Sequence, residues 1–141
     1  METYVIYRLA LFQENVLYDL YLFDKREGIV KWDKNSILNL RNVTLGSIQD
    51  RPNAWPTSME LDGFTYSRFS SREDSGDPNN FFYRDLDWFL EWLAKSKNYS
   101  PQPYLYLTNV ISSSNDKQKA NEILFASKER ERSLASGLNW L

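Results

Sequence analysis

The chain has no cysteine and no histidine among its 141 residues. Without cysteine there can be no disulfide, thiolate nucleophile, zinc ribbon or iron–sulfur cluster. Without histidine the chain lacks the commonest general base and the commonest metal ligand, which excludes Ser-His-Asp catalysis and haem ligation by histidine. We therefore expect no cofactor and no enzyme activity, and the sequence favours a protein that binds over one that catalyses.

The chain also has no large excess of charge of one sign and no long apolar run. The 17 basic and 19 acidic side chains give a net charge of −2, without the basic excess that a phosphate-tracking protein needs. The apolar stretch over residues 4–12 contains Arg8, and no run approaches the roughly 18 apolar residues of a membrane span. Met1-Glu2-Thr3 lacks the basic start of an export signal. We expect no direct nucleic-acid partner, no membrane partner and a cytoplasmic location.

Composition divides the chain into three zones. Residues 1–69 are rich in Val, Ile, Leu, Tyr and Phe between turn residues, which predicts strands. Residues 70–80 carry no apolar side chain and predict a polar linker loop. Residues 81–141 show helical spacing of apolar side chains over most of their length. The predicted fold class is α+β, a β-rich N-terminal part followed by a C-terminal three-helix unit in one compact domain.

The β-rich zone contains a spaced pattern of alternating apolar pairs. The pairs are Leu20/Leu22, Leu38/Leu40 and Met59/Leu61. They recur about every 18–21 residues, a spacing suited to stacked turns of a β-solenoid. An ordinary meander is the alternative, and residues 1–36 either extend the solenoid or form a separate hairpin.

The helical zone carries start and stop signals. Asp77-Pro78 can cap a first helix that runs to about Lys97, and Ser100-Pro101 can open a second. The run Ser112-Ser113-Ser114-Asn115 ends that helix, and a third continues into the charged residues 128–132. The inward faces are expected to hold Phe82, Leu86, Phe89, Leu90, Leu93, Tyr104, Leu107, Val110, Ile111, Ala120, Ile123, Leu124 and Ser127. The second and third helices are predicted to form a helical hairpin, with the first packed across it.

Several segments together carry a family resemblance. They are the run from Leu38 to Asp50, the dipeptide Trp55-Pro56, the run from Leu61 to Tyr66, and Tyr99-Ser100-Pro101-Gln102-Pro103-Tyr104. Residues 37–132 resemble the last β-helix turns and helical hairpin of bacterial pentapeptide-repeat-like proteins. The resemblance implies a short, stand-alone version of that module from a bacterium or phage. Members are often labelled membrane-associated oxidoreductase, but this chain has no Gly-x-Gly-x-x-Gly, so the redox label does not transfer.

Aromatic side chains make up 16% of the chain and supply the candidate binding residues. A Trp on an exposed loop is a good anchor for a protein partner, and two short helices cannot bury every ring they carry. The candidates for a partner-binding surface are Trp55, Tyr83, Trp88, Trp92, Tyr106 and Trp140. The competing interpretation is that Trp55 plugs the flank of the β-rich part and that the helical rings pack between helices and strands.

Acidic residues offer weaker candidates. Asp85 and Asp87 lie two apart on a predicted helix and do not share a face, and Asp62 with Asp50 is the other conceivable pair. The acidic run over residues 73–77 lacks the twelve-residue register of a calcium loop, so we interpret it as an ordinary loop and expect no metal.

The sequence therefore predicts a non-catalytic protein–protein binding module that acts as an adaptor or a stoichiometric inhibitor, for example an antagonist of a bacterial defence system. One alternative is a structural, self-associating solenoid that forms a homo-oligomer through an exposed edge. The other is a carboxylate-based hydrolase, which requires two acids converging in one pocket.

Overall fold

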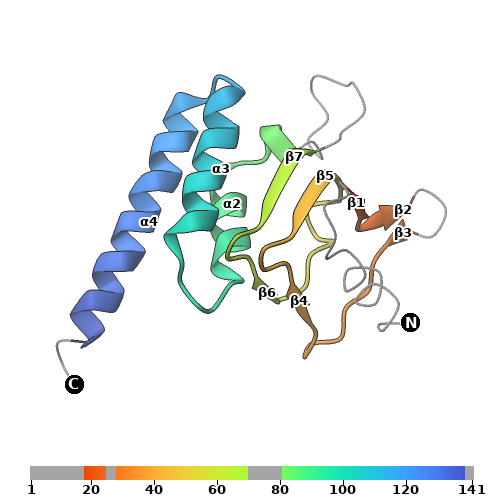
Figure 1. Cartoon of the computed structure of the whole chain (residues 1–141), viewed down its shortest axis with the longest axis horizontal. Coiled ribbons are helices and arrows are strands. Elements are labelled where there is room, and N and C mark those ends of the chain that lie inside the picture. Colours follow the sequence, from red (N-terminus) through yellow and green to blue (C-terminus); the bar gives the residue numbers. More distant parts are fainter. Residues whose placement is uncertain (1–17, 25–27, 70–80, 139–141) are drawn as a thin grey trace.

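The computed structural model describes residues 18–24, 28–69 and 81–138 (Figure 1). The described residues between 18 and 69 form short strands, here called the strand region, and residues 81–138 form the helical region beside it. The mixed α+β class is thus confirmed. The polar run 70–80, residues 1–17 and Trp140 lie outside the described residues.

Four strands of the strand region form two parallel pairs. β4 (Ile37–Asn39) pairs with β6 (Ser58–Glu60), which sets Leu38 beside Met59. β5 (Thr44–Gln49) pairs with β7 (Thr65–Phe69), which sets Leu45 beside Tyr66. Both pairings join residues 21 positions apart, so the predicted spacing of Leu38/Leu40 and Met59/Leu61 corresponds to direct neighbours in space.

The turns that lead from β4 to β5 and from β6 to β7 also match. Asn42 follows β4 with φ +55°, and Gly63 follows β6 with φ +75°. Both lie in the left-handed region, which Gly adopts freely and Asn adopts more readily than other residues. The two turns are stacked, because the Asn42 N–H donates to the Asp62 carbonyl at 3.0 Å. A left-handed residue at the same place in each repeat gives both chain segments the same bend.

The earliest described strands depart from this spacing. β1 (Tyr18–Tyr21) pairs with β5 in a three-stranded sheet of order β1-β5-β7, and sets Leu20 beside Ile48. β2 (Phe23–Asp24) and β3 (Gly28–Ile29) form an antiparallel pair. The prediction that Leu20/Leu22 continues the stack of Leu38/Leu40 is therefore wrong, because main-chain pairing places Leu20 one strand further along, against β5.

The helical region contains a short 3-10 helix, η1 (Phe81–Tyr83), followed by α2 (Leu86–Ala94), α3 (Pro101–Ser113) and α4 (Lys117–Leu138). Ser100 caps α3 and Pro101 begins it, as predicted, and α3 ends within the predicted serine run. The first helix begins later than predicted and ends earlier, since Asp85 is its N-cap and Ala94 its last residue. Asp77-Pro78 lies outside the described residues.

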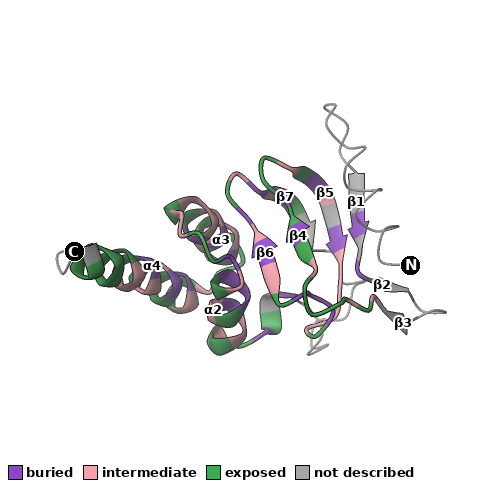
Figure 2. Ribbon diagram, turned by 90° about the horizontal axis from the view of Figure 1, so that it is seen from below, coloured by how far each residue is buried: buried purple, intermediate pink, exposed green. Residues whose placement is uncertain are grey.

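Apolar side chains from both regions form one core. The strand region contributes its alternating residues, and the helical region contributes rings and aliphatic side chains from its helices. Figure 2 shows buried residues on the strands and on the helices beside them. The most deeply buried large side chains are Leu22, Leu38, Leu40, Leu45, Ile48, Met59, Leu61, Phe81, Phe89, Trp92, Leu93 and Leu107. Among the helices described, none combines the length and the apolar character needed to cross a membrane.

Candidate protein-binding surface

A buried ion pair joins the two regions. Asp50 follows β5, and Arg84 lies between η1 and α2. The Arg84 guanidinium donates to both carboxylate oxygens of Asp50 at 2.8 Å, and the two side chains are 2% and 4% exposed. The guanidinium carbon also lies 4.2 Å from the centre of the Trp88 ring. This two-pronged geometry fits a planar guanidinium, and it fixes the start of α2 against the end of β5.

Indole groups hold the segment that follows Asp50, here called the 50–56 loop. Trp55 Nε1 donates to Asp50 Oδ2 at 2.6 Å, while Trp88 Nε1 donates to the Pro52 carbonyl at 3.0 Å. Trp32 Nε1 reaches the Ala54 carbonyl at 2.7 Å. Three tryptophans from three parts of the chain thus satisfy polar groups of a single loop, so the loop is held by side chains rather than by strand pairing.

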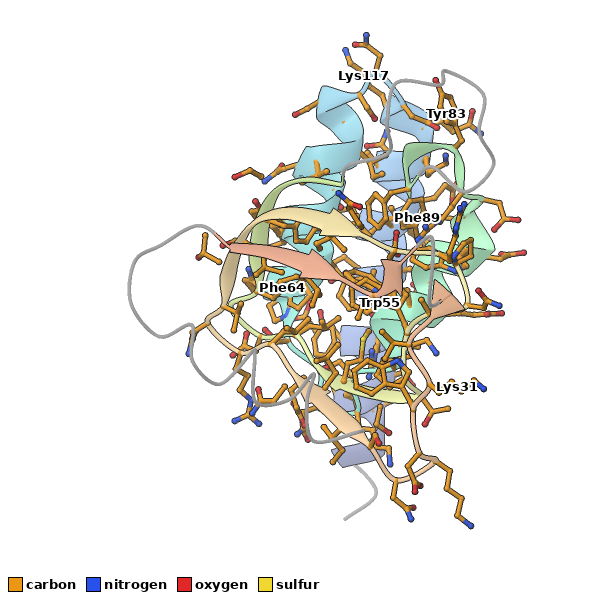
Figure 3. The ribbon with its side chains drawn as sticks, turned by 90° about the vertical axis from the view of Figure 1, so that its right-hand side faces the viewer. Lys31, Trp55, Phe64, Tyr83, Phe89 and Lys117 are labelled. Atoms are coloured by element: carbon orange, nitrogen blue, oxygen red, sulfur yellow. The ribbon has the colours of Figure 1, made fainter. Side chains whose placement is uncertain are left out.

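Two of the predicted anchor residues are buried. Trp55 is 6% exposed and Trp92 is 2% exposed, and their rings meet edge to face with centroids 5.3 Å apart. Figure 3 shows Trp55 among the interior side chains, close to the strands. As exposed anchors these two residues were wrongly predicted, because their indole rings fill the space between the strand and helical regions. The competing interpretation of Trp55 as a plug describes its position.

The other predicted residues differ in exposure. Tyr83 is 56% exposed and lies at the periphery in Figure 3, so it keeps its place as a candidate contact residue. Trp88 is half-buried over Arg84. Tyr106 is also half-buried, and its hydroxyl bonds to the main chain of Tyr66. Trp140 is outside the described residues, and its predicted role remains a prediction.

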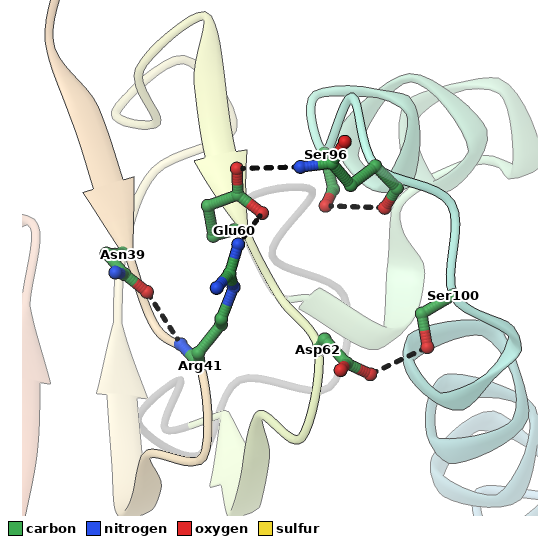
Figure 4. Close-up of polar contacts among 7 residues, drawn as sticks. Asn39, Arg41, Glu60, Asp62, Ser96 and Ser100 are labelled. Atoms are coloured by element: carbon green, nitrogen blue, oxygen red, sulfur yellow. Dashed lines mark hydrogen bonds and ion pairs between the residues drawn. The ribbon is translucent and has the colours of Figure 1, made fainter.

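Three of the four candidate carboxylates, those of Asp50, Asp62 and Asp85, are engaged in structural bonds. Asp50 pairs with Arg84, and Asp85 caps α2 by accepting from the Trp88 N–H at 3.0 Å. Asp62 accepts a 2.6 Å hydrogen bond from the Ser100 hydroxyl (Figure 4). Across the described ranges, the acidic side chains form no group of three that could hold a metal ion. The acidic run over residues 73–77, which the sequence predicts to be an ordinary loop, lies outside these ranges.

A polar strip links the strand edge to the segment before α3. Glu60 accepts from Arg41 and from Asn98, both at 3.4 Å, and Figure 4 shows it between β4 and the start of the helices. These contacts are long and exposed, so they contribute little to stability.

The long helix α4 has an anchored part and a projecting part. Ala120, Ile123 and Ser127 are buried, and α4 packs against α2 and α3, here called with the strand region the body of the protein. Arg130 then donates to the Tyr104 hydroxyl and to the Ser96 carbonyl, both at 2.8 Å. Residues 131–137 are all exposed, and Figures 1 and 2 both show this end of α4 extending beyond the other helices.

Leu134 is the large apolar residue of the projecting part, residues 131–137, and it is 50% exposed. The side-chain bonds of Glu131, Arg132 and Ser136 all stay within α4. Leu134 was not among the predicted binding residues, because the charged residues 128–132 indicated an ordinary solvated stretch. The signal was the continued three-and-four spacing from Ala120 onwards, which reaches Leu134.

Two titratable groups have shifted pKa values. Burial raises the pKa of Tyr66 well above its ordinary value, and the neighbouring Tyr106 raises it further. The pKa of Asp116 is lowered, chiefly because its carboxylate accepts a hydrogen bond from the Lys119 N–H. Asp116 precedes α4 and acts as its cap, whereas Tyr66 stays neutral inside the core. Both shifts follow from the structural positions of the two groups.

Comparison with protein families, with curated proteins and with solved structures finds no match to this chain. The resemblance to pentapeptide-repeat-like proteins therefore stays a prediction from the residues that carry it.

Proposed function

We propose that the chain is a non-catalytic protein-binding module and that the projecting part of α4 forms part of its binding surface. The observation that carries this proposal is the stripe formed by Ala120, Ile123, Ser127, Arg130 and Leu134. The first three residues are buried against the body, and Leu134 continues the same stripe into solvent. A helix face that is covered for most of its length and then runs on uncovered is suited to a second protein.

The energetics of helices support a partner at this position. Most helical stability in proteins comes from tertiary packing of one face, and short unsupported helices are marginal in water. Residues 131–137 have no such packing in the described chain. A protein that covers Leu134 would add the missing contacts and stabilise the last two turns of α4.

The partner proposed here is a different protein that offers an apolar groove. Two projecting helices laid together would cover mainly the Leu134 side chains, far less than the roughly 800 Å² per partner of a stable interface. A groove can enclose Leu134 and also touch the adjoining body, as in helix-in-groove recognition. An adaptor and a stoichiometric inhibitor would both use such a surface, and the effect of one equivalent of this chain on the partner's activity distinguishes them.

A matched pair of variants tests the proposal. Leu134→Glu places a charge on the stripe, whereas Ser133→Glu places the same charge at the adjacent exposed position. We expect a tagged pull-down from the native host to recover one protein near one-to-one with the unaltered chain and with Ser133→Glu, and to lose it with Leu134→Glu. A photo-crosslinker at position 134 should attach to the same protein.

The outcomes are separable. Equal capture by both variants would place the binding surface elsewhere and contradict the proposal. Concentration-dependent self-association that Leu134→Glu abolishes would instead identify a second copy as the occupant, in line with the self-associating alternative. Sedimentation of the purified variants distinguishes these results, because it measures self-association directly. Both substituted positions are exposed, so neither substitution disturbs the core.

We also propose that β4 to β7 represent two coils of a short parallel β-solenoid. Support comes from the common 21-residue offset of both pairings and from the stacked left-handed turns at Asn42 and Gly63. The Thr44 and Thr65 hydroxyls, 2.9 Å apart, add a stacked side-chain contact at the same offset. An experimental structure in which Leu38 and Leu45 do not neighbour Met59 and Tyr66 would contradict this proposal.

A further inference from the structure

β7 and the two residues before it carry main-chain groups on the side that faces away from β5, here called the β7 edge. The Thr65 N–H donates to the Val43 carbonyl, toward the neighbouring repeat. Polar groups of Gly63, Phe64 and Tyr66 bond on the other side, toward α3. Such an edge is a template for another strand unless something covers it.

Two side chains of α3 form hydrogen bonds with these main-chain groups, and each both donates and accepts, as a peptide group does. Gln102 Oε1 accepts from the Gly63 N–H at 2.9 Å, and its Nε2 donates to the Phe64 carbonyl at 3.3 Å. The Tyr106 hydroxyl donates to the Tyr66 carbonyl at 2.6 Å and accepts from the Tyr66 N–H at 3.2 Å. Each side chain supplies one donor and one acceptor, as a residue of a neighbouring strand would.

The spacing of the two side chains explains why a helix can do this. Gln102 and Tyr106 lie four residues apart on α3, a rise of about 6 Å along the helix. Groups that face one side of a strand recur every second residue, about 6.6 Å apart. One turn of helix therefore matches one repeat of the strand edge. The outer edge of β6, in the other parallel pair, is met by main chain instead, since the Met59 N–H donates to the Lys95 carbonyl at 3.0 Å.

We infer that α3 is a surrogate strand that closes the β7 edge against a second copy of this chain. Two copies with this edge uncovered would present identical surfaces, which can pair antiparallel about a two-fold axis. Gln102 and Tyr106 prevent that pairing by occupying the hydrogen-bonding groups. The inference is independent of the proposed partner surface, which lies on the projecting part of α4.

Amide hydrogen exchange, measured by NMR, tests the hydrogen bonds. In a Gln102→Ala/Tyr106→Phe double variant, exchange at Gly63 and Tyr66 should accelerate by about five-fold or more, the effect of one lost hydrogen bond. Exchange at Thr65, whose N–H faces Val43, should change less. Tyr99→Phe is the matched control, because its lost hydroxyl contacts Ser127 between helices and not the strand edge.

Sedimentation velocity tests the closure. The double variant should form dimers at concentrations where the unaltered chain and Tyr99→Phe do not. A double variant that shows faster exchange but the same sedimentation would overturn the inference, and so would acceleration at Thr65 equal to that at Gly63 and Tyr66. If the double variant does not fold, the single variant Tyr106→Phe, whose ring still packs on Tyr66 with centroids 4.9 Å apart, is judged by exchange at Tyr66 relative to Thr65 and by sedimentation.

Discussion

The strand region and the helical region are stabilised by different kinds of contact. In the strand region, β4 and β5 are related to β6 and β7 by a constant offset and stacked turns, so main-chain bonds and small local features set the geometry of these four strands. The helical region depends on rings and on side-chain bonds to distant residues, with the Asp50–Arg84 pair as its junction to the strands. We therefore expect the strand region to be most sensitive to substitutions at its stacked turns. The helical region should be most sensitive to substitutions that remove a side-chain contact with a distant residue.

The largest expected effect is at the junction. Arg84→Ala leaves the Asp50 carboxylate buried beside Trp55 without its counter-charge, and removing one partner of a buried pair costs about 3–5 kcal/mol. Arg41→Ala is the control, because its pair with Glu60 is exposed and contributes about 0–1 kcal/mol. Urea unfolding of both variants measures the difference. Equal losses would mean that the two regions do not depend on this junction.

An intermediate effect is expected at the stacked turn. Gly63→Ala forces a side chain onto a residue with φ +75° and sets its Cβ 2.2 Å from Asn42 Oδ1. The backbone conformation alone should cost about 1–2 kcal/mol. Gly137→Ala has nothing within 4 Å of the new Cβ and should instead stabilise α4 by up to about 1 kcal/mol. Thermal unfolding measures both effects, and midpoints that shift in the same direction for the two variants would contradict this contrast.

The smallest effect concerns pH. The folded-state pKa of Asp116 is lowered from 3.8, so its contribution to stability is present above that pH and disappears as pH falls through the folded pKa. Asp116→Ala should lose about 1 kcal/mol at neutral pH through the missing helix cap, and almost nothing once the carboxyl is protonated. Unfolding free energies of both proteins, measured at pH 7 and at a series of lower pH values, test this. A loss that stays constant with pH would show that the carboxylate charge has no role.

Local signals made much of the fold predictable. Ser100-Pro101 gave the start of α3, and the alternation of Leu38/Leu40 with Met59/Leu61 gave two strands that prove to be neighbours. The start of α2 was predicted too early, because Asp77-Pro78 and Asp85 are equally good caps in sequence. Only the tertiary bond from Arg84 to Asp50 distinguishes the observed start. The pairing of Leu20 with Ile48 was likewise beyond a spacing argument.

The candidate site was less predictable. Exposed and buried aromatics look alike in sequence, and Trp55 and Trp92 are buried because their partners come from the other region. The three-and-four spacing of apolar residues on α4 reaches Leu134, but whether Leu134 is exposed depends on how far along α4 the other helices extend. The roles of Gln102 and Tyr106 have no sequence signal, since they require α3 to lie against a particular strand edge.

The contact between Trp55 and Trp92 gives the molecule a built-in optical reporter. One indole belongs to the strand region and the other to the helical region, and Trp92 stacks on Trp88 with centroids 6.1 Å apart. Rings so close share their electronic transitions, so near-ultraviolet dichroism and fluorescence respond to their mutual orientation. Separation of the two regions therefore changes this spectrum independently of any loss of secondary structure, so the order of events in unfolding can be followed without any added label.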